Sequence, residues 1–345
     1  MKYITRDMPQ YKANLHSHSC LSDGTLTPEQ MAEEYKKRGY SILAITDHEA
    51  PYDHTDLSSE NFLMLTGWEA YIRPNAECRT EYFGPEIHMN LLAREPHITT
   101  YVAYDPNFCK YMPHELAEAL PQAGTGLGAR KYSPDYINAF IAAAREAGYL
   151  VTYNHPVWSM EEPERILQYD GWFSLEVFNS GCTVISGHEQ NLALYERLMR
   201  HGKFPFVHGA DDNHNKKPLD DFLSDSFRSW TMVLAEDLSY PSVIRALEEG
   251  RFYASTGPEI REFTIEGTHV HMEFTPAQRV VLCMSEKKCL NAYRSDGGEI
   301  TSADFEIPDY APWFFLTVTD ARGREAVTHS FTREQLDLRA PSVLL

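Results

Sequence analysis

Three side chains near the start of the chain could bind a metal ion. His16 and His18 directly follow residues 11–15, which predict a short β-strand. Side chains two positions apart on a strand point to the same side, so the two imidazoles would project together from the end of this strand. Asp23 follows in a turn with Gly24 that can fold back toward the strand. Imidazoles and carboxylates are common ligands of divalent metals, although a His-x-His pair alone is weak evidence for a site.

The next elements must position these side chains at one edge of a sheet. Residues 27–39 predict a helix, in which Thr27 is the N-cap and Gln30 completes a capping box. Residues 40–46 are nearly all apolar, which is typical of a strand buried on both faces, and His48 lies just beyond its end. A strand, a helix and a second strand indicate a parallel sheet, whose sites gather at the carboxyl ends of the strands.

Later strands repeat this arrangement. Each is predicted to carry a ligand-type residue or to end just before one: residues 61–66 with Glu69, residues 86–92 with His88, residues 149–153 with His155, and residues 204–207 with Asp212 and His214. Residues 134–147 predict the clearest helix, which stops at Gly148. Residues 101–130 do not continue the alternation of strands and helices. We expect them to form a long irregular segment that covers the site. The Gly-x-Gly-x-Gly run within them lacks the features of a phosphate loop.

The pattern of the sequence changes near residue 260. Beyond it, short alternating or apolar runs are separated by turns such as residues 320–323. This pattern predicts an antiparallel β module, and a small sandwich fits it best. We therefore assign residues 1–260 to the domain that carries the site and residues 261–345 to an accessory β domain. His269-Val-His271 is a second His-x-His pair, which we interpret as one face of a strand.

Composition limits the function. The chain has 345 residues, 43% of them hydrophobic, which is enough for one large and one small domain. The formal charge of -19 argues against a broad nucleic-acid or anionic-membrane surface, but not against a small anionic substrate bound through metal ions. The first residues are polar, and no apolar run is long enough for a membrane span. The six cysteines lack Cys-x-x-Cys spacing, so we expect reduced thiols in a cytoplasmic protein.

The ordered motifs resemble those of the PHP (polymerase and histidinol phosphatase) family of metal-dependent phosphoesterases. They are His16-x-His18, Ser22-Asp23-Gly24, Thr46-Asp47-His48, Gly67-x-Glu69, His88, Asn154-His155-Pro156 and Asp212-x-His214. The resemblance covers about residues 11–258, and the combined motifs are highly specific. It implies an α/β fold, a distorted seven-stranded β/α barrel with metals at the carboxyl ends of its strands. The run from Gly250 to Pro258, followed by a β module, is similar to a two-domain branch with a C-terminal antiparallel β-sandwich.

The resemblance also implies which residues bind metal. Two or three divalent ions, Mn, Fe or Zn, would be held in three groups: His16, His18, Glu69 and Asp212 for the first, Glu69 with His88 and His155 for the second, and Asp23, His48 and His214 for the third. The family often has His at the position of Asp23, and an oxygen ligand there favours Mn, Fe or Mg over zinc alone. Either Asp211 or Asp212 could ligate, and the Asp-x-His spacing favours Asp212. Asp47 would orient His48 or a neighbour.

The expected activity is hydrolysis of a small phosphomonoester, with nucleotides among the candidates, by in-line attack of a metal-bound hydroxide. The alternatives are hydrolysis of a carboxylic ester, amide or carbamate with the same metals, and a non-catalytic metal-binding protein whose β module binds a ligand or partner. His208, which lies outside the motif, is a candidate proton shuttle or a residue that supports the metal ligands from behind. The candidates for binding a phosphate are Arg130, Lys131, Lys216, Lys217 and Arg228. The alternative for each is that it is a charged residue on the solvent-exposed surface. The exact substrate, the native metal, the number of ions, the oligomeric state and the role of the β module stay open.

Overall fold

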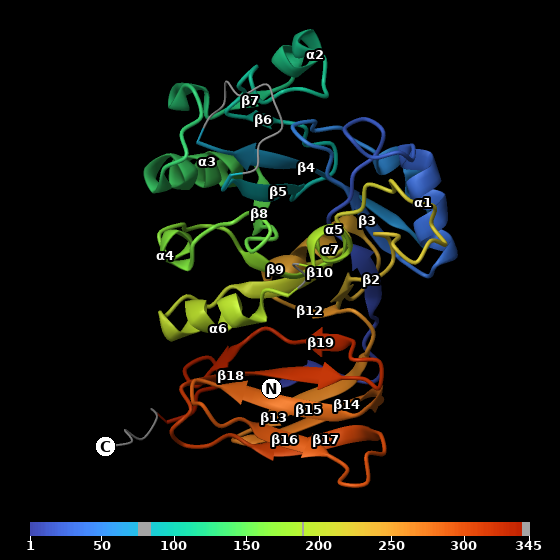
Figure 1. Ribbon diagram of the computed structural model, residues 1–345, viewed down its shortest axis with the longest axis vertical. Coiled ribbons are helices and arrows are strands. Elements are labelled where there is room, and N and C mark those ends of the chain that lie inside the picture. Colours follow the sequence, from blue (N-terminus) through green and yellow to red (C-terminus); the bar gives the residue numbers. More distant parts are fainter. Residues whose placement is uncertain (75–83, 188–189, 340–345) are drawn as a thin grey trace.

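The computed structural model describes residues 1–74, 84–187 and 190–339 of an α/β protein (Figure 1). Its main feature is one long sheet. The strands lie in this spatial order: β10 (Phe206–Ala210), β9 (Ser174–Asn179), β8 (Tyr149–Tyr153), β5 (Ile87–Ala93), β4 (Leu63–Ile72), β3 (Ile42–Ile45), β2 (Tyr11–Asn14), β11 (Trp230–Val233), β12 (Phe252–Ser255), β19 (Glu325–Val327), β18 (Trp313–Thr319), β15 (Arg279–Met284) and β16 (Leu290–Tyr293), with β20 (Phe331–Thr332) also paired to β18.

Strand direction decides which ends carry the site. Strands β2, β3 and β4 are parallel to one another, as are β8, β9 and β10. Strand β5 runs antiparallel to both of its neighbours, β4 and β8. The first residues of β5 therefore lie beside the last residues of β4, and His88 is opposite Tyr71. β4 continues to Ile72, well past the predicted end at residue 66, because the pairing with β5 extends it.

The long sheet curls, but its described strands do not close. Beyond the carboxyl ends of β2 and β10, a single bridge joins Ser17 to Asn213, and the Thr231 hydroxyl on β11 donates to the Gly209 carbonyl on β10 at 2.8 Å. Among the described residues, no ladder joins β10 to β2, β11 or β12. A closed seven-stranded barrel, as expected from the resemblance, is therefore not confirmed. The sheet is curled so that its outermost strand, β10, approaches β2, β11 and β12 in the middle of the same sheet, near the candidate ligands.

Helices and short elements complete this part of the chain: α1 (Pro28–Lys37), η1 (Thr55–Leu57), β6 (Tyr101–Val102), α2 (His114–Ala119), β7 (Gln122–Ala123), η2 (Thr125–Leu127), α3 (Pro134–Glu146), α4 (Pro163–Ile166), α5 (Ser180–Ser186), α6 (Leu192–Arg200) and α7 (Tyr240–Glu248). The predicted capping box of α1 is confirmed, since the Thr27 N–H donates to Gln30 Oε1 at 2.9 Å and the Gln30 N–H donates to Thr27 Oγ1 at 3.3 Å. Across the described stretches, each helix is too short or too polar to cross a bilayer.

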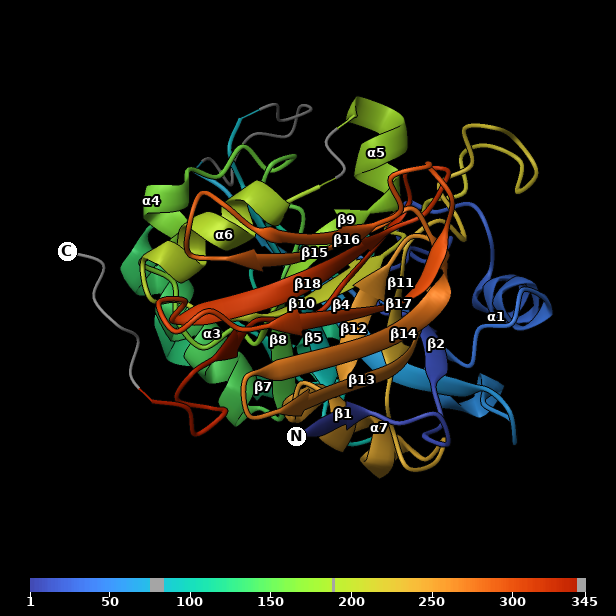
Figure 2. The same ribbon diagram turned by 90° about the horizontal axis from the view of Figure 1, so that it is seen from below.

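The strands after residue 260 are antiparallel, as predicted, and gather at one end of the molecule (Figures 1 and 2). A four-stranded sheet contains β1 (Lys2–Ile4), β13 (Ile260–Glu266), β14 (His269–Ala277) and β17 (Ile300–Glu306). The long sheet passes from β12 into β19, where Ala254 pairs with Val327. One core cluster contains Met232 and Tyr253 together with Phe274 and Leu316. The two parts of the chain thus share a sheet and a core, and the division at residue 260 stays a prediction.

Candidate metal centre

The loop after β2 presents the first candidate ligands. His16 and His18 are completely buried beyond the end of β2. The turn that carries Asp23 is held by Asp47, whose carboxylate accepts hydrogen bonds from the Ser19 N–H at 2.7 Å, the Ser19 hydroxyl and the Ser22 hydroxyl, both at 2.6 Å. Asp47 was expected to orient His48 or a neighbour, and its hydrogen bonds position the turn beside His18 and Asp23.

Glycine is required in the same turn. A Cβ at position 24 would lie 2.1 Å from the carbonyl oxygen of His18. Any other residue would therefore push the turn away from His18 and displace Asp23. The Ser-Asp-Gly motif has a local steric cause, which the spacing of the residues alone had not revealed.

Glu69, on β4, is the centre of the cluster. Its carboxylate is completely buried and lies within 3.4 Å of a ring nitrogen of five histidines: His16 at 3.1 Å, His18 at 3.4 Å, His48 at 3.0 Å, His88 at 3.2 Å and His155 at 3.4 Å. The amide of Asn154 donates to the same carboxylate at 2.8 Å. Side chains from β4, β5 and the loops after β2, β3 and β8 therefore meet at one point.

Asp212 lies on the opposite side of His16 and His18. Its Oδ1 atom is 3.2 Å from His16 Nε2 and 3.0 Å from His18 Nε2, and its Oδ2 atom is 3.7 Å from His155 Nε2. Asp211 points away and accepts hydrogen bonds from the Tyr35 hydroxyl at 2.7 Å and the Phe227 N–H at 2.7 Å. The geometry therefore favours Asp212 over Asp211 as the ligand, in agreement with the spacing.

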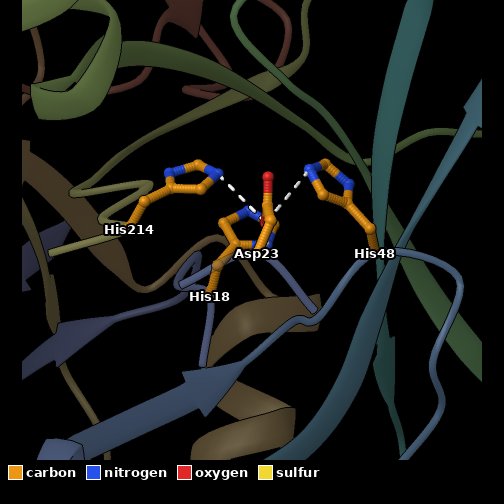
Figure 3. Close-up of side chains that lie close together, drawn as sticks. All are labelled: His18, Asp23, His48 and His214. Carbon is orange, nitrogen blue, oxygen red and sulfur yellow. Dashed lines mark ion pairs between the residues drawn. The ribbon is translucent and has the colours of Figure 1, made fainter. Parts of the chain in front are cut away.

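A second group of ligand-type atoms surrounds Asp23 (Figure 3). Asp23 Oδ1 lies 3.4 Å from His214 Nε2, 3.9 Å from His48 Nε2 and 3.9 Å from His18 Nδ1. His18 and His48 therefore each present one ring nitrogen to Glu69 and the other to Asp23. The nine predicted residues are brought together, but His18 lies between two groups instead of belonging to the first alone.

The unpaired atoms of the cluster fit metal ions. Within the described stretches, the buried atoms His18 Nδ1, His48 Nδ1 and Glu69 Oε2 have no hydrogen-bond partner. His16 Nε2 and His18 Nε2 face each other at 3.2 Å, a contact in which only one of two neutral rings could donate. Nitrogen and oxygen atoms that ligate one ion at about 2.1 Å lie about 3 Å apart, as these do. Four sets of at least three such atoms lie close enough together to hold an ion.

The charges of the cluster are strongly coupled. Burial alone would raise the pKa of Glu69, but His16, His88 and His48 hold it well below its usual value. Burial alone would lower the pKa of His88, but Glu69 and Glu86 raise it to about 10. Burial, together with His48 and His214, lowers the pKa of His18 to about 4. Carboxylates are thus ionised and some imidazoles protonated, so metal binding should release protons.

Glu176, on β9, is a site residue that the sequence analysis missed. It is completely buried, and its Oε1 atom accepts a hydrogen bond from His16 Nδ1 at 2.9 Å. Its Oε2 atom accepts from the His155 N–H at 3.0 Å and from the Asn179 amide at 2.8 Å. Glu176 thus orients two candidate ligands from behind. The only signal in the sequence was a carboxylate within residues 171–178, whose pattern predicts a strand, and this does not distinguish Glu176 from other acidic residues.

His208 lies behind Glu176 and away from the cavity. Its Nδ1 atom contacts the Ser174 hydroxyl at 2.8 Å, and its Nε2 atom is 3.9 Å from Glu176 Oε1. Burial lowers its pKa to about 4. A neutral, enclosed imidazole in this position does not reach a bound substrate, so the geometry does not support a proton shuttle.

The basic residues that were predicted to grip a phosphate are mostly placed elsewhere. The Arg130 side chain is completely buried and donates to both carboxylate oxygens of Glu49. Lys131 is exposed and does not line the site cavity, and Arg228 lines a separate cavity. Arg130, Lys131 and Arg228 are thus not placed as substrate residues. Of the five basic candidates, Lys216 and Lys217 do line the site cavity.

The cavity above the cluster has a volume of about 500 Å³. Its floor contains Asp23, Glu69 and Asp212, and its wall includes residues of α5 and of the loop after β10. Gly181 allows α5 to lie against this loop, because a Cβ there would be 2.5 Å from the Asp212 carbonyl oxygen. A smaller hollow of about 180 Å³ adjoins the cluster and is lined by Arg73, Glu86 and Lys110, among others.

Comparison with known proteins agrees with the motifs. The family model described as PHP domain matches residues 13–150, so the chain carries a PHP domain. The chain is 33% identical over 87 residues to the DNA polymerase/3'-5' exonuclease PolX of Bacillus subtilis, which covers 20% of this chain and 15% of that protein. It is 36% identical over 89 residues to an error-prone DNA polymerase of Mycobacterium tuberculosis, which covers 24% of this chain and 8% of the polymerase. The chain thus corresponds to only a small part of the length of these relatives.

The solved structures that match this chain include a two-domain protein from Bacteroides vulgatus, described as containing a predicted PHP-like metal-dependent phosphoesterase. It is 16% identical, with a TM-score of 0.46, and the match covers 94% of this chain and 95% of that one. A lesion-specific endonuclease from Pyrococcus furiosus is 13% identical, with a TM-score of 0.40, and the match covers 70% of this chain and 56% of the endonuclease.

Proposed function

We propose that this chain, which carries a PHP domain, is a metal-dependent hydrolase that acts on a small phosphomonoester. The observation that carries the proposal is the convergence of nine imidazole and carboxylate side chains around Glu69, at the floor of a cavity. The nine are His16, His18, Asp23, His48, Glu69, His88, His155, Asp212 and His214. Two or three divalent ions, Mn, Fe or Zn, would be held by them.

The bound ions would activate a water molecule and neutralise the negative charge of the phosphoryl group. The chain's own residues hold and orient the ligands. Glu176 fixes the ring of His16, and Asn154 fixes the carboxylate of Glu69. Lys216 and Lys217 offer positive charge beside the cluster, where an anionic substrate would enter. This local charge supports an anionic substrate even though the chain as a whole is acidic.

We further propose that the curled sheet is a distorted barrel and that the strands after residue 260 form an accessory β-sandwich. The bridge from Ser17, beyond β2, to Asn213, beyond β10, supports the first part. The antiparallel pairing of β13, β14 and β17 supports the second. We also propose a cytoplasmic enzyme with a small-molecule substrate.

The test combines metal analysis with a matched substrate set. The purified protein would be reconstituted with Mn, Fe or Zn and assayed with p-nitrophenyl phosphate, bis-p-nitrophenyl phosphate and p-nitrophenyl acetate. We expect two or three ions per chain and the highest kcat/KM on the monoester. A clear lead for the acetate would replace the phosphatase with an ester or amide hydrolase. Bound metal without turnover of any of the three would favour a non-catalytic metal-binding protein.

A further inference from the structure

Part of the outer wall of the site cavity is apolar. The apolar residues that line the cavity beyond the candidate ligands include Trp158, Val184, Ile185 and Leu223. Ile185 is 70% exposed and Leu223 is 46% exposed, so neither is needed to fill the core. Exposed apolar side chains that gather at the mouth of a site indicate a binding surface.

Trp158 connects this wall to the metal ligands. Its ring centroid lies 5.0 Å from that of His155 and 5.7 Å from that of His88, in both cases edge to face. The indole is only half-buried and lines the cavity. A group attached to the reacting atom would therefore meet an aromatic surface before it reaches solvent.

The wall offers few partners for a polar substrate. Apart from the candidate ligands, the charged side chains among the described residues lining the cavity are Lys216, Lys217 and Asp225. The Asp225 carboxylate is occupied, because it accepts from the His214 N–H at 2.8 Å and from the Asn215 N–H at 3.2 Å. Lys216 Nζ donates to the Asp23 carbonyl oxygen. Sugar hydroxyls placed against Val184, Ile185 and Leu223 would lose water without gaining hydrogen bonds, which is unfavourable.

We infer that the substrate of this site carries an apolar body, either a branched alkyl or an aryl group, next to its anionic group. This inference rests on the proposed function and narrows it, since it disfavours sugar phosphates. Trp158, Val184, Ile185 and Leu223 contact the apolar body. Lys217, and the N–H donors of Lys216 that the Asp23 carbonyl does not use, are left for the anionic end.

Binding of non-hydrolysable phosphonates tests the inference without requiring turnover. Calorimetry on the Mn-loaded protein would compare methylphosphonate, n-butylphosphonate and phenylphosphonate. Burial of apolar surface strengthens binding by up to about fourfold per methylene group. Because the wall is partly open to solvent, we expect n-butylphosphonate and phenylphosphonate to bind at least about tenfold more tightly than methylphosphonate. Equal affinity for the three compounds would overturn the inference.

Two neighbouring residues of one loop provide a matched pair of variants. Leu223→Ser removes a wall residue and should weaken n-butylphosphonate binding by about threefold or more while leaving methylphosphonate binding unchanged. Phe222→Ser is the control, because Phe222 is 86% exposed and does not line the cavity. It should leave both affinities unchanged. If Leu223→Ser behaved like Phe222→Ser, the wall would not contact the ligand body.

Failure of this inference can be distinguished from failure of the proposed function. Suppose that phenyl phosphate and ribose 5-phosphate are hydrolysed with equal kcat/KM and that the three phosphonates bind with equal affinity. The proposed phosphatase activity would then be supported, and the inference of an apolar substrate body would be wrong. If the larger phosphonates bind more tightly but neither ester is hydrolysed, the inference of an apolar ligand body would be supported and the proposed phosphatase activity would be wrong. Tighter binding of the larger phosphonates together with turnover of phenyl phosphate supports both.

Discussion

Glu69 is the residue on which the cluster depends most, because it contacts imidazoles from both sides. Its Oε1 atom faces His16, His88 and His155, and its Oε2 atom faces His18 and His48. A carboxylate can serve two ions through its two oxygens, whereas a neutral imidazole has one free lone pair. His18 and His48, although placed between two groups, can each serve one ion at a time.

Glu69→Gln should therefore lose more than one ion per chain. The amide has only one oxygen, so one of the two oxygens that would coordinate metal is lost. In its place, an N–H₂ group brings hydrogen-bond donors to the histidine rings that would ligate the metal. We expect kcat to fall by more than about 100-fold. Metal analysis and steady-state kinetics measure both effects. Glu248→Gln, an exposed carboxylate paired with Arg94, is the control and should change neither. Full metal content and rate in Glu69→Gln would show that Glu69 does not bridge.

Glu176→Gln tests whether a buried carboxylate behind the ligands sets metal affinity. Both of its oxygens accept hydrogen bonds, so an amide N–H₂ group would face a donor, either His16 Nδ1 or the His155 N–H and the Asn179 amide. We expect metal affinity to fall by about 10- to 100-fold. Competition with a chelator measures this. An unchanged affinity would mean that His16 is oriented by its other contacts alone.

At the scale of elements, a buried ion pair ties the segment of residues 101–130 to the loop after β3, which carries Glu49. Arg130 donates to both oxygens of Glu49, and the Tyr101 hydroxyl and the Tyr71 N–H donate to the same carboxylate at 2.8 Å and 3.0 Å. The sequence made Arg130 a candidate for binding a phosphate. Its position indicates a structural role instead, because a buried charge without its partner is strongly unfavourable.

Arg130→Ala should lower the free energy of unfolding by about 3–5 kcal/mol, because it leaves Glu49 buried and unpaired. Lys131→Ala, one residue further along and exposed, should change it by less than about 0.5 kcal/mol. Urea unfolding of the two variants measures the difference. A raised KM with unchanged stability in Arg130→Ala would restore the earlier expectation of a phosphate contact.

The loop between β8 and α4 contains a carboxyl that should make stability depend on pH. Burial raises the pKa of Glu161 from 4.5 to about 7, and the Tyr153 hydroxyl donates to it at 3.0 Å. The folded chain binds more protons than the unfolded chain between these two values. The stabilisation from the protonated carboxyl is therefore complete below pH 4.5 and is lost as the pH rises through about 7.

Glu161→Gln should remove this dependence. Compared with the unaltered protein, its free energy of unfolding should rise by up to about 3 kcal/mol between pH 4.5 and pH 8. Urea unfolding of the two metal-free proteins at pH 5 and pH 8 measures the change, and other titrating groups cancel in the comparison. A difference that is independent of pH would show that Glu161 titrates normally.

At the scale of the whole molecule, the two ends of the chain complete each other. Strand β1 pairs with β13, and β12 pairs with β19. The core cluster that contains Met232 and Tyr253 is filled by residues beyond 260. A chain ending at residue 260 would leave the edge of β12 unpaired and expose this apolar surface.

We therefore expect residues 1–260 expressed alone to be insoluble or to unfold without cooperativity. Solubility and thermal unfolding, with the full chain as the control, measure this. If the fragment were soluble and unfolded in one sharp transition, the first 260 residues would be an independent domain despite the shared sheet.

Much of this protein follows from short-range features of its sequence. The capping box at Thr27 and the stop signal at Gly148 predicted α1 and α3 because caps involve residues only a few positions apart. The ordered motifs resembled those of the PHP family, and the PHP domain model matches residues 13–150. The alternation beyond residue 260 likewise predicted antiparallel strands.

Only the tertiary structure decided which partner each side chain meets. Arg130 and Lys216 are both basic residues outside the predicted elements, yet one is buried against Glu49 and the other lines the cavity. Glu176 became a site residue through the pairing of β9 with β8 and β10, which no local pattern encodes. The open edge of the curled sheet and the passage from β12 into β19 also depend on strands far apart in the chain. Contacts of this kind are set by packing between distant segments, and packing is a property of the whole fold.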